Sequence, residues 1–171
     1  MPVMDDAKII KKAREYVRTY GTRDPELLAR ELGVRIHDAD FENLKGVYKV
    51  ILRNPFIFIK KDLDPVMRKI VLLHELGHHA LHRREAQIFQ EFSLFTDMTV
   101  SRMEYEANLF AAEISLPDDE ILDYIYQGYD AEFIAAAMDS DINLVALKVA
   151  ELNRRGHNFY SLKHSNRFLL R

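Results

Sequence analysis

The feature that most restricts how this chain can fold is the run His74-Glu75-Leu76-Gly77-His78. Histidines four residues apart lie on one face of an α-helix, about 40° apart around its axis, so both can bind one cation. The chain contains no cysteine, which excludes disulfides and thiolate metal sites and leaves His, Asp and Glu as ligands. The run therefore predicts a zinc site on a helix, with His74 and His78 as ligands and a third ligand supplied by another element.

The residues around this pair have separate expected roles. Glu75 can reach a water beside the metal without binding the metal itself, as a general base requires. Gly77 costs about 1 kcal/mol relative to alanine inside a helix, which suggests that another backbone or a substrate approaches closely there. His79 is turned away from the metal-binding face and His82 lies two turns beyond the first histidine. We expect these two to support the site, to pack or to face solvent.

The third ligand is expected among the carboxylates of residues 101–108. Glu104 is our choice because Ala107 and Ala111 share its helical face, where small residues allow close packing on the histidine helix. Glu106 is the alternative, although it lies on a different face of the same helix.

Two neighbours of Glu104 bear on this assignment. Asn108 follows it by one turn and is placed to orient a ligated imidazole. Ser101-x-x-Glu104 also matches a capping box, in which the carboxylate would only accept a hydrogen bond from a backbone amide. The sequence leaves both interpretations of Glu104 open.

The rest of the sequence predicts an α+β fold, with a small antiparallel sheet packed on the active-site helix and further helices around it. Asp24-Pro25 and Asp64-Pro65 each pair a helix N-cap with a first-turn proline. Helices are expected over residues 7–20, 25–32, 65 into the histidines, 101–116, 130–138 and 142–152, and strands over 34–36, 46–52 and 56–60. Residues 84–98 have no clean period and are expected to wrap over the site.

The length favours one domain over residues 1–171. Within it we expect a core at 1–125, a helical appendage at 126–155 and a basic tail at 156–171. The net charge of −3 and the pI of about 6.2 make nucleic acid an unlikely partner, even though residues 130–152 are spaced like a helix-turn-helix. The longest apolar run, residues 133–138, is too short to span a bilayer, and the N-terminus is acidic, so we expect a cytoplasmic protein.

The chain resembles the ImmA/IrrE family of zincin-like metallopeptidases, which includes phage anti-repressor proteases and radiation-response regulators. The resemblance is carried by residues 20–25, 32–33, 45–48, 74–82 and 104–117. It implies a zincin-like fold, a bound Zn²⁺ and a helix-turn-helix repressor as protein substrate, whose cleavage relieves repression. The similarity also implies that the third ligand is Glu104, which precedes Ala107-Asn108 by three residues.

The leading interpretation is a zinc endopeptidase in which Glu75 acts on the attacking water. A non-catalytic regulator is the alternative, in which zinc only ties two helices together and the chain acts by binding a protein or DNA partner. A metallohydrolase for a small amide is a third possibility. For a peptide substrate, we expect an extended strand alongside the sheet edge at residues 56–60.

Overall fold

The computed structural model describes residues 4–88 and 97–160 and, for residues 88 and 97–101, the helical backbone alone. The helices are α1 (Asp6–Tyr20), α2 (Pro25–Glu31), α3 (Pro65–Leu81), α4 (Arg83–Ile88), α5 (Asp97–Ser115), α6 (Asp118–Tyr126), α7 (Ala131–Ala137) and α8 (Ile142–Arg154), and the strands are β1 (Arg35–Ala39), β2 (Gly46–Ile51) and β3 (Asn54–Lys60). The α+β, zincin-like fold class is confirmed. In the segment expected to wrap over the site, residues 84–88 belong to α4, and residues 89–96 lie outside the described residues. Residues 161–171 of the expected tail also lie outside them.

Aspartates begin the first three helices as N-caps. The carboxylates of Asp5, Asp24 and Asp64 accept hydrogen bonds from backbone N–H groups at the starts of α1, α2 and α3. At α2 and α3 the aspartate is followed by a proline in the first turn, as the Asp-Pro pairs predict. The helix with the histidine run thus begins two and a half turns before His74.

The sheet is mixed, with strand order β1-β3-β2. Strand β2 pairs antiparallel with β3 through a two-residue turn at Leu52-Arg53, but β1 pairs parallel with β3. The expectation of an antiparallel sheet is therefore wrong for β1, because β3 inserts between the two earlier strands. Residues 56–60 consequently lie in the central strand, and the expectation that they form a substrate-binding edge is also wrong. The edge strands are β1 and β2.

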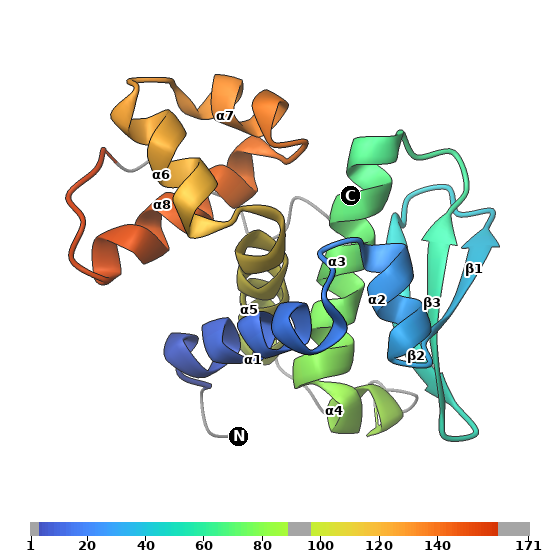
Figure 1. Cartoon of the computed structure of the whole chain (residues 1–171). Helices are drawn as coiled ribbons and strands as arrows, with labels where there is room; N and C mark the ends of the chain where they lie inside the picture. Colours follow the sequence, from blue (N-terminus) through green and yellow to red (C-terminus); the bar gives the residue numbers. More distant parts are fainter. Residues whose placement is uncertain (1–3, 89–96, 161–171) are drawn as a thin grey trace.

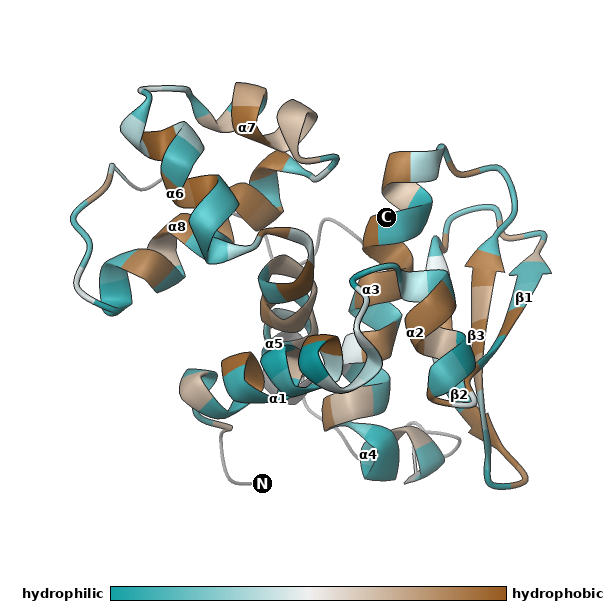
Figure 2. Cartoon of the chain, in the orientation of Figure 1, coloured by the Kyte–Doolittle hydropathy of each residue, from teal (hydrophilic) through white to brown (hydrophobic). Residues whose placement is uncertain are grey.

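Helix α3 lies between the sheet and α5 (Figure 1). Its residues Ile70 to Leu73 are buried, and Figure 2 shows hydrophobic residues along α3, α5 and β3. Glycine allows close contact on both sides of the helix. A Cβ on Gly46 of β2 would lie 2.6 Å from Val71 Cγ1, and one on Gly77 would lie 3.0 Å from the Cα and O atoms of Ala107 in α5. The close approach expected at Gly77 is confirmed.

Helices α6, α7 and α8 form a group on the side of α5 away from the sheet (Figure 1). The ammonium of Lys148, on α8, is fully buried and lies 2.5 Å from Glu113 of α5 and 2.6 Å from Asp118 of α6. Asp118 also accepts hydrogen bonds from Arg14 of α1 and Arg155. These ion pairs link α6 and α8 to α5 and α1.

The second helix of a helix-turn-helix reads DNA from an exposed face. Residues 130–152, whose spacing resembles a helix-turn-helix, contain α7 and α8, so α8 is the second helix of that pattern. Eight of the residues from Leu144 to Leu152 in α8 are buried.

Within the described residues, no helix combines the length and apolar character needed to cross a membrane.

Candidate metal centre

Three side chains from two helices converge where α3 crosses α5. His74 Nε2 lies 3.1 Å from His78 Nε2 and 3.0 Å from Glu104 Oε2, and His78 Nε2 lies 3.2 Å from Glu104 Oε1. His74 and Glu104 are buried, and His78 is largely so. The structure therefore brings together the three residues expected as ligands.

The arrangement fits a metal ion better than a hydrogen-bonded cluster. Glu104 Oε2 is buried without a hydrogen bond of good geometry in the described chain, although it lies 3.0 Å from His74 Nε2. Bonds of roughly 2.0 to 2.1 Å to a tetrahedral zinc ion place its ligand atoms about 3.3 Å apart, close to the three distances here. Two imidazoles and one carboxylate are also a set that catalytic zinc sites use, with a fourth position left for water.

The capping-box interpretation of Glu104 does not hold. Helix α5 begins at Asp97, so Ser101 lies inside the helix and is not its N-cap. The carboxylate of Glu104 is turned towards His74 and His78 instead.

Each of the two histidines is held through its second ring nitrogen. His74 Nδ1 lies 2.7 Å from Asn108 Oδ1, the contact expected of Asn108. An amide oxygen only accepts, so His74 carries its hydrogen on Nδ1 and presents the lone pair of Nε2 to the cluster.

His78 is held by a longer chain of contacts. Its Nδ1 lies 2.9 Å from His82 Nδ1, and His82 Nε2 lies 2.8 Å from Glu106 Oε2. Arg102 donates through Nε to Glu106 Oε1 at 2.9 Å. Glu106, the alternative third ligand, thus binds His82 and lies outside the three-residue cluster. His82 supports the site, one of the roles expected for it.

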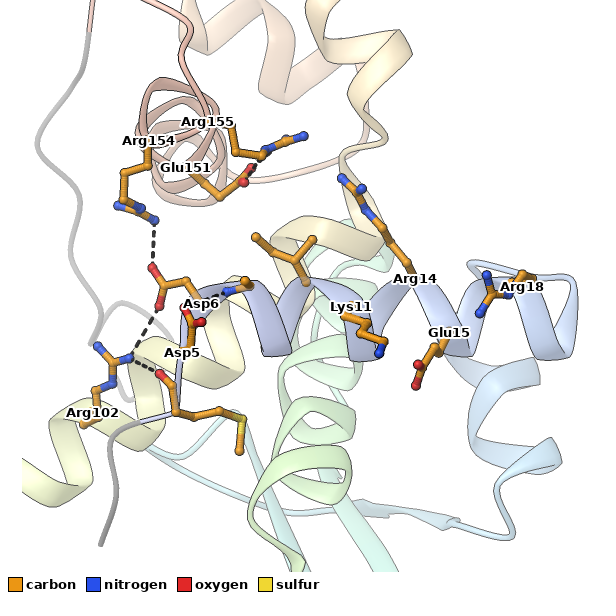
Figure 3. Close-up of a pocket in the computed structure, with 13 residues that line it drawn as sticks. Asp5, Asp6, Lys11, Arg14, Glu15, Arg18, Arg102, Glu151, Arg154 and Arg155 are labelled. Carbon is orange, nitrogen blue, oxygen red and sulfur yellow. Dashed lines mark hydrogen bonds and ion pairs between the residues drawn. The ribbon is translucent and has the colours of Figure 1, made fainter.

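Arg102 continues these contacts towards the N-terminus. It donates to the backbone carbonyl of Met4 at 2.7 Å and lies 3.4 Å from Asp6, which Arg154 of α8 also contacts (Figure 3). No role was predicted for Arg102 from the sequence. Its spacing of four residues from Glu106 is the signal that could have found it.

Glu75 projects from α3 towards β2, and its side chain is almost fully buried. The backbone of Tyr48 hydrogen-bonds to its carboxylate. Gly46 lies next to Glu75: a Cβ there would lie 3.4 Å from Glu75 Cγ and Oε1, an ordinary contact, whereas it would clash with Val71. The hydroxyl of Tyr48 lies 2.9 Å from His79 Nδ1, so His79 packs on β2, away from the cluster. No role was predicted for Tyr48 or Gly46, although a lone glycine inside a strand often marks a close approach.

The electrostatics suit proton transfer next to a cation. Burial, together with repulsion from Glu104, raises the pKa of Glu75 to about 7, and burial lowers the pKa of His78 to about 4. Burial would also raise the pKa of Glu104, but contacts with His74 and His78 outweigh it and hold that pKa below its ordinary value. At neutral pH the cluster thus presents an ionised carboxylate and a neutral His78, which are forms that bind metal. Burial would lower the pKa of His74, but its contact with Glu104 outweighs this and raises that pKa, so a metal ion that binds here competes with a proton for His74.

Comparison with known proteins agrees with this geometry. Residues 29–149 match the IrrE N-terminal-like domain, a peptidase family. The chain belongs to this family. The matched residues contain the cluster, Glu75 and most of α8, and they cross the boundary expected at residues 125 and 126.

Two relatives match across most of their length. The chain is 32% identical over 143 residues to a protein named "Uncharacterized immunity region protein 2" from Bacillus phage phi105, covering 82% of this chain and 89% of that protein. It is 26% identical over 155 residues to "Metallopeptidase ImmA" of Bacillus subtilis strain 168, covering 88% and 89%. The chain is thus a metallopeptidase of this family.

Proposed function

We propose that the chain is a zinc-dependent endopeptidase that cleaves a helix-turn-helix transcriptional repressor in the cytoplasm and so relieves repression. The observation that carries the catalytic part is the convergence of His74, His78 and Glu104 with the buried carboxylate of Glu75 beside them. These three would hold the ion, and a bound zinc ion supplies Lewis-acid chemistry, polarising a peptide carbonyl and acidifying water.

Glu75 supplies the proton transfer. Its carboxylate accepts a proton from the attacking water and then donates it to the nitrogen of the leaving amine. A base with a pKa near the working pH performs both transfers well, and burial gives Glu75 that property. The hydrogen bond from Tyr48 fixes where the carboxylate lies.

The substrate backbone is proposed to pair with β2. This strand pairs with β3 on one side only among the described residues, and it lies against α3 at Gly46 and Glu75. The backbone N–H of Lys60 in β3 donates to the carbonyl of Lys45. Along an antiparallel strand, the backbone groups of successive residues point alternately towards the partner strand and away from it. The backbone groups of Gly46 and Tyr48 therefore point away from β3. A peptide added along this edge lies beside Glu75.

The repressor as substrate rests on resemblance. One relative's name refers to a phage immunity region and the other is named Metallopeptidase ImmA, and the sequence resembles anti-repressor proteases of that family.

The test compares the wild type, Glu75→Gln and His78→Ala, each incubated with the helix-turn-helix regulator encoded nearest to its gene. Glu75→Gln keeps the size and helix propensity of the side chain but removes its basicity, so zinc content and thermal stability are retained. Cleavage, followed by mass spectrometry, falls about 10²- to 10⁴-fold. His78→Ala loses zinc and cleavage together, because it removes a ligand.

The same three proteins separate the enzyme from a scaffold. Derepression of a reporter is expected to follow cleavage and to be lost in Glu75→Gln. Full derepression by a zinc-loaded Glu75→Gln protein that cleaves nothing would overturn the peptidase function and leave the metal site standing.

A further inference from the structure

We infer that His82, Glu106 and Arg102 form a hydrogen-bond relay that fixes which nitrogen of His78 carries its hydrogen, and so prepares His78 to bind metal. The three are positioning residues. The inference rests on the metal site of the proposed function and needs no knowledge of the substrate.

The relay follows from counting donors and acceptors along the chain of contacts. Two imidazole nitrogens only 2.9 Å apart, His78 Nδ1 and His82 Nδ1, share one hydrogen. If this hydrogen is bonded to His78 Nδ1, then His78 Nε2 has a free lone pair facing Glu104. If it is bonded to His82 Nδ1, a neutral His78 carries its own hydrogen on Nε2, where it blocks metal binding.

Glu106 selects the first arrangement. Its Oε2 accepts from His82 Nε2 at 2.8 Å, and a carboxylate can only accept. A neutral His82 with its hydrogen on Nε2 has a bare Nδ1, which must accept from His78. One carboxylate thus sets the state of a metal ligand through two successive hydrogen bonds.

Arg102 completes the relay by balancing charge. Its guanidinium donates to Glu106 Oε1 at 2.9 Å, so the buried carboxylate has a cation partner and does not require one from His82. The exposed fractions of His82 and Glu106 are 2% and 5%, so water does not substitute for these contacts. His82 also ends α3, where its backbone N–H bonds to the carbonyl of His78 at 2.8 Å. The ring contact and the backbone hydrogen bond together fix the position of His82 relative to His78.

The relay makes a specific prediction for Glu106→Gln. Arg102 donates to the near oxygen, so the glutamine turns its amide oxygen to Arg102 and its NH₂ group to His82. His82 Nε2 must then accept, its hydrogen moves to Nδ1, and His78 is forced into the state that cannot bind metal. Zinc affinity, measured by chelator competition, is expected to fall about 10- to 100-fold. The visible absorption spectrum of the Co²⁺-loaded protein is expected to change with it.

Removing Arg102 as well distinguishes a relay from simple packing. In the double variant Glu106→Gln with Arg102→Met, nothing holds the amide oxygen away from His82, so the glutamine can rotate and accept from it. The second substitution is therefore expected to restore most of the zinc affinity and the wild-type Co²⁺ spectrum, whereas damage to packing would only accumulate. Tyr105→Phe is the matched control on the same helix, because it removes a hydroxyl that bonds Asp6 and Arg154 but keeps the ring that packs on Arg102, so the three relay side chains keep their hydrogen bonds to one another. It should leave zinc affinity unchanged.

Two results would overturn the relay: wild-type zinc affinity and Co²⁺ spectrum in Glu106→Gln, or a double variant that binds zinc no better than Glu106→Gln alone. These readouts involve no peptide. A wild-type protein that binds zinc but cleaves no repressor would overturn the proposed function and not the relay, and one that binds no metal would overturn both.

Discussion

At Gly77 the backbones of α3 and α5 touch. A methyl group there would lie 3.0 Å from backbone atoms of Ala107, which cannot rotate away, so the two helices must move apart by a few tenths of an ångström. Alanine gains about 1 kcal/mol of helix propensity, but overpacking of this kind costs about 1 to 3 kcal/mol. We therefore predict that Gly77→Ala weakens zinc binding and gives no gain in stability, measured by urea unfolding of metal-free protein and by chelator competition. A protein stabilised by about 1 kcal/mol with unchanged zinc affinity would show that the contact relaxes freely.

The two acidic residues on α5 differ in what they touch. Glu104 faces both histidine Nε2 atoms, whereas Glu106 reaches His78 only through His82. Glu104→Gln should therefore cost more zinc affinity than Glu106→Gln in the same chelator assay, because it replaces a charged ligand atom. The reverse order would make Glu106 the ligand.

Among the elements, α8 depends on a buried ion-pair cluster. Burial would raise the pKa of Asp118, but its bonds to Arg155 and Lys148 hold that pKa well below its ordinary value. A carboxyl that is more acidic folded than unfolded stabilises the fold fully above its unfolded pKa, and this contribution is lost as the pH falls through the folded value.

Asp118→Asn is predicted to destabilise the protein by about 1 to 3 kcal/mol at pH 7, because it removes one of the negative charges that balance the buried ammonium of Lys148. The difference in urea midpoint from the wild type should stay constant above about pH 5 and shrink below about pH 4. A difference that does not change with pH down to 3 would mean that Asp118 acts through packing and not through its charge.

The elements also show how far local sequence reaches. Asp-Pro pairs placed the starts of α2 and α3 correctly, because capping depends on residues a few positions apart. The parallel pairing of β1 and the central place of β3 were missed, because strand order depends on contacts between distant segments that no local pattern encodes.

The candidate site divides in the same way. His74, His78 and Glu104 were predicted because helical periodicity fixes which side chains share a face. Tyr48 was missed, since its backbone contact with Glu75 exists only once distant elements pack. The spacing of Arg102 from Glu106 is local, but its bonds to Met4 and Asp6 also depend on distant elements.

For the molecule as a whole, a metal ion bound between α3 and α5 adds a link between segments far apart in sequence. A ligand that binds only the folded state, present at 100 times its dissociation constant, stabilises by about 2.7 kcal/mol. For a chain of this size this corresponds to a rise in melting temperature of about 5 to 10 °C when the metal binds. We predict that a chelator lowers the melting temperature by the same amount and that added zinc restores it, measured by differential scanning fluorimetry. His78→Ala should show no such change. Equal melting temperatures with and without chelator would argue against a metal link between the two helices.

Helix α5 carries Glu104 near its middle and Glu113 close to its C-terminal end, nine residues or roughly 13 to 14 Å apart along its axis. The first faces the histidines, and the second holds the buried ammonium of α8. Helix α5 therefore connects the candidate metal cluster directly to the ion pairs around Lys148. No loop separates Glu104 from Glu113, so a displacement of α8 that moves Glu113 is expected to move the carboxylate that faces His74 and His78 as well.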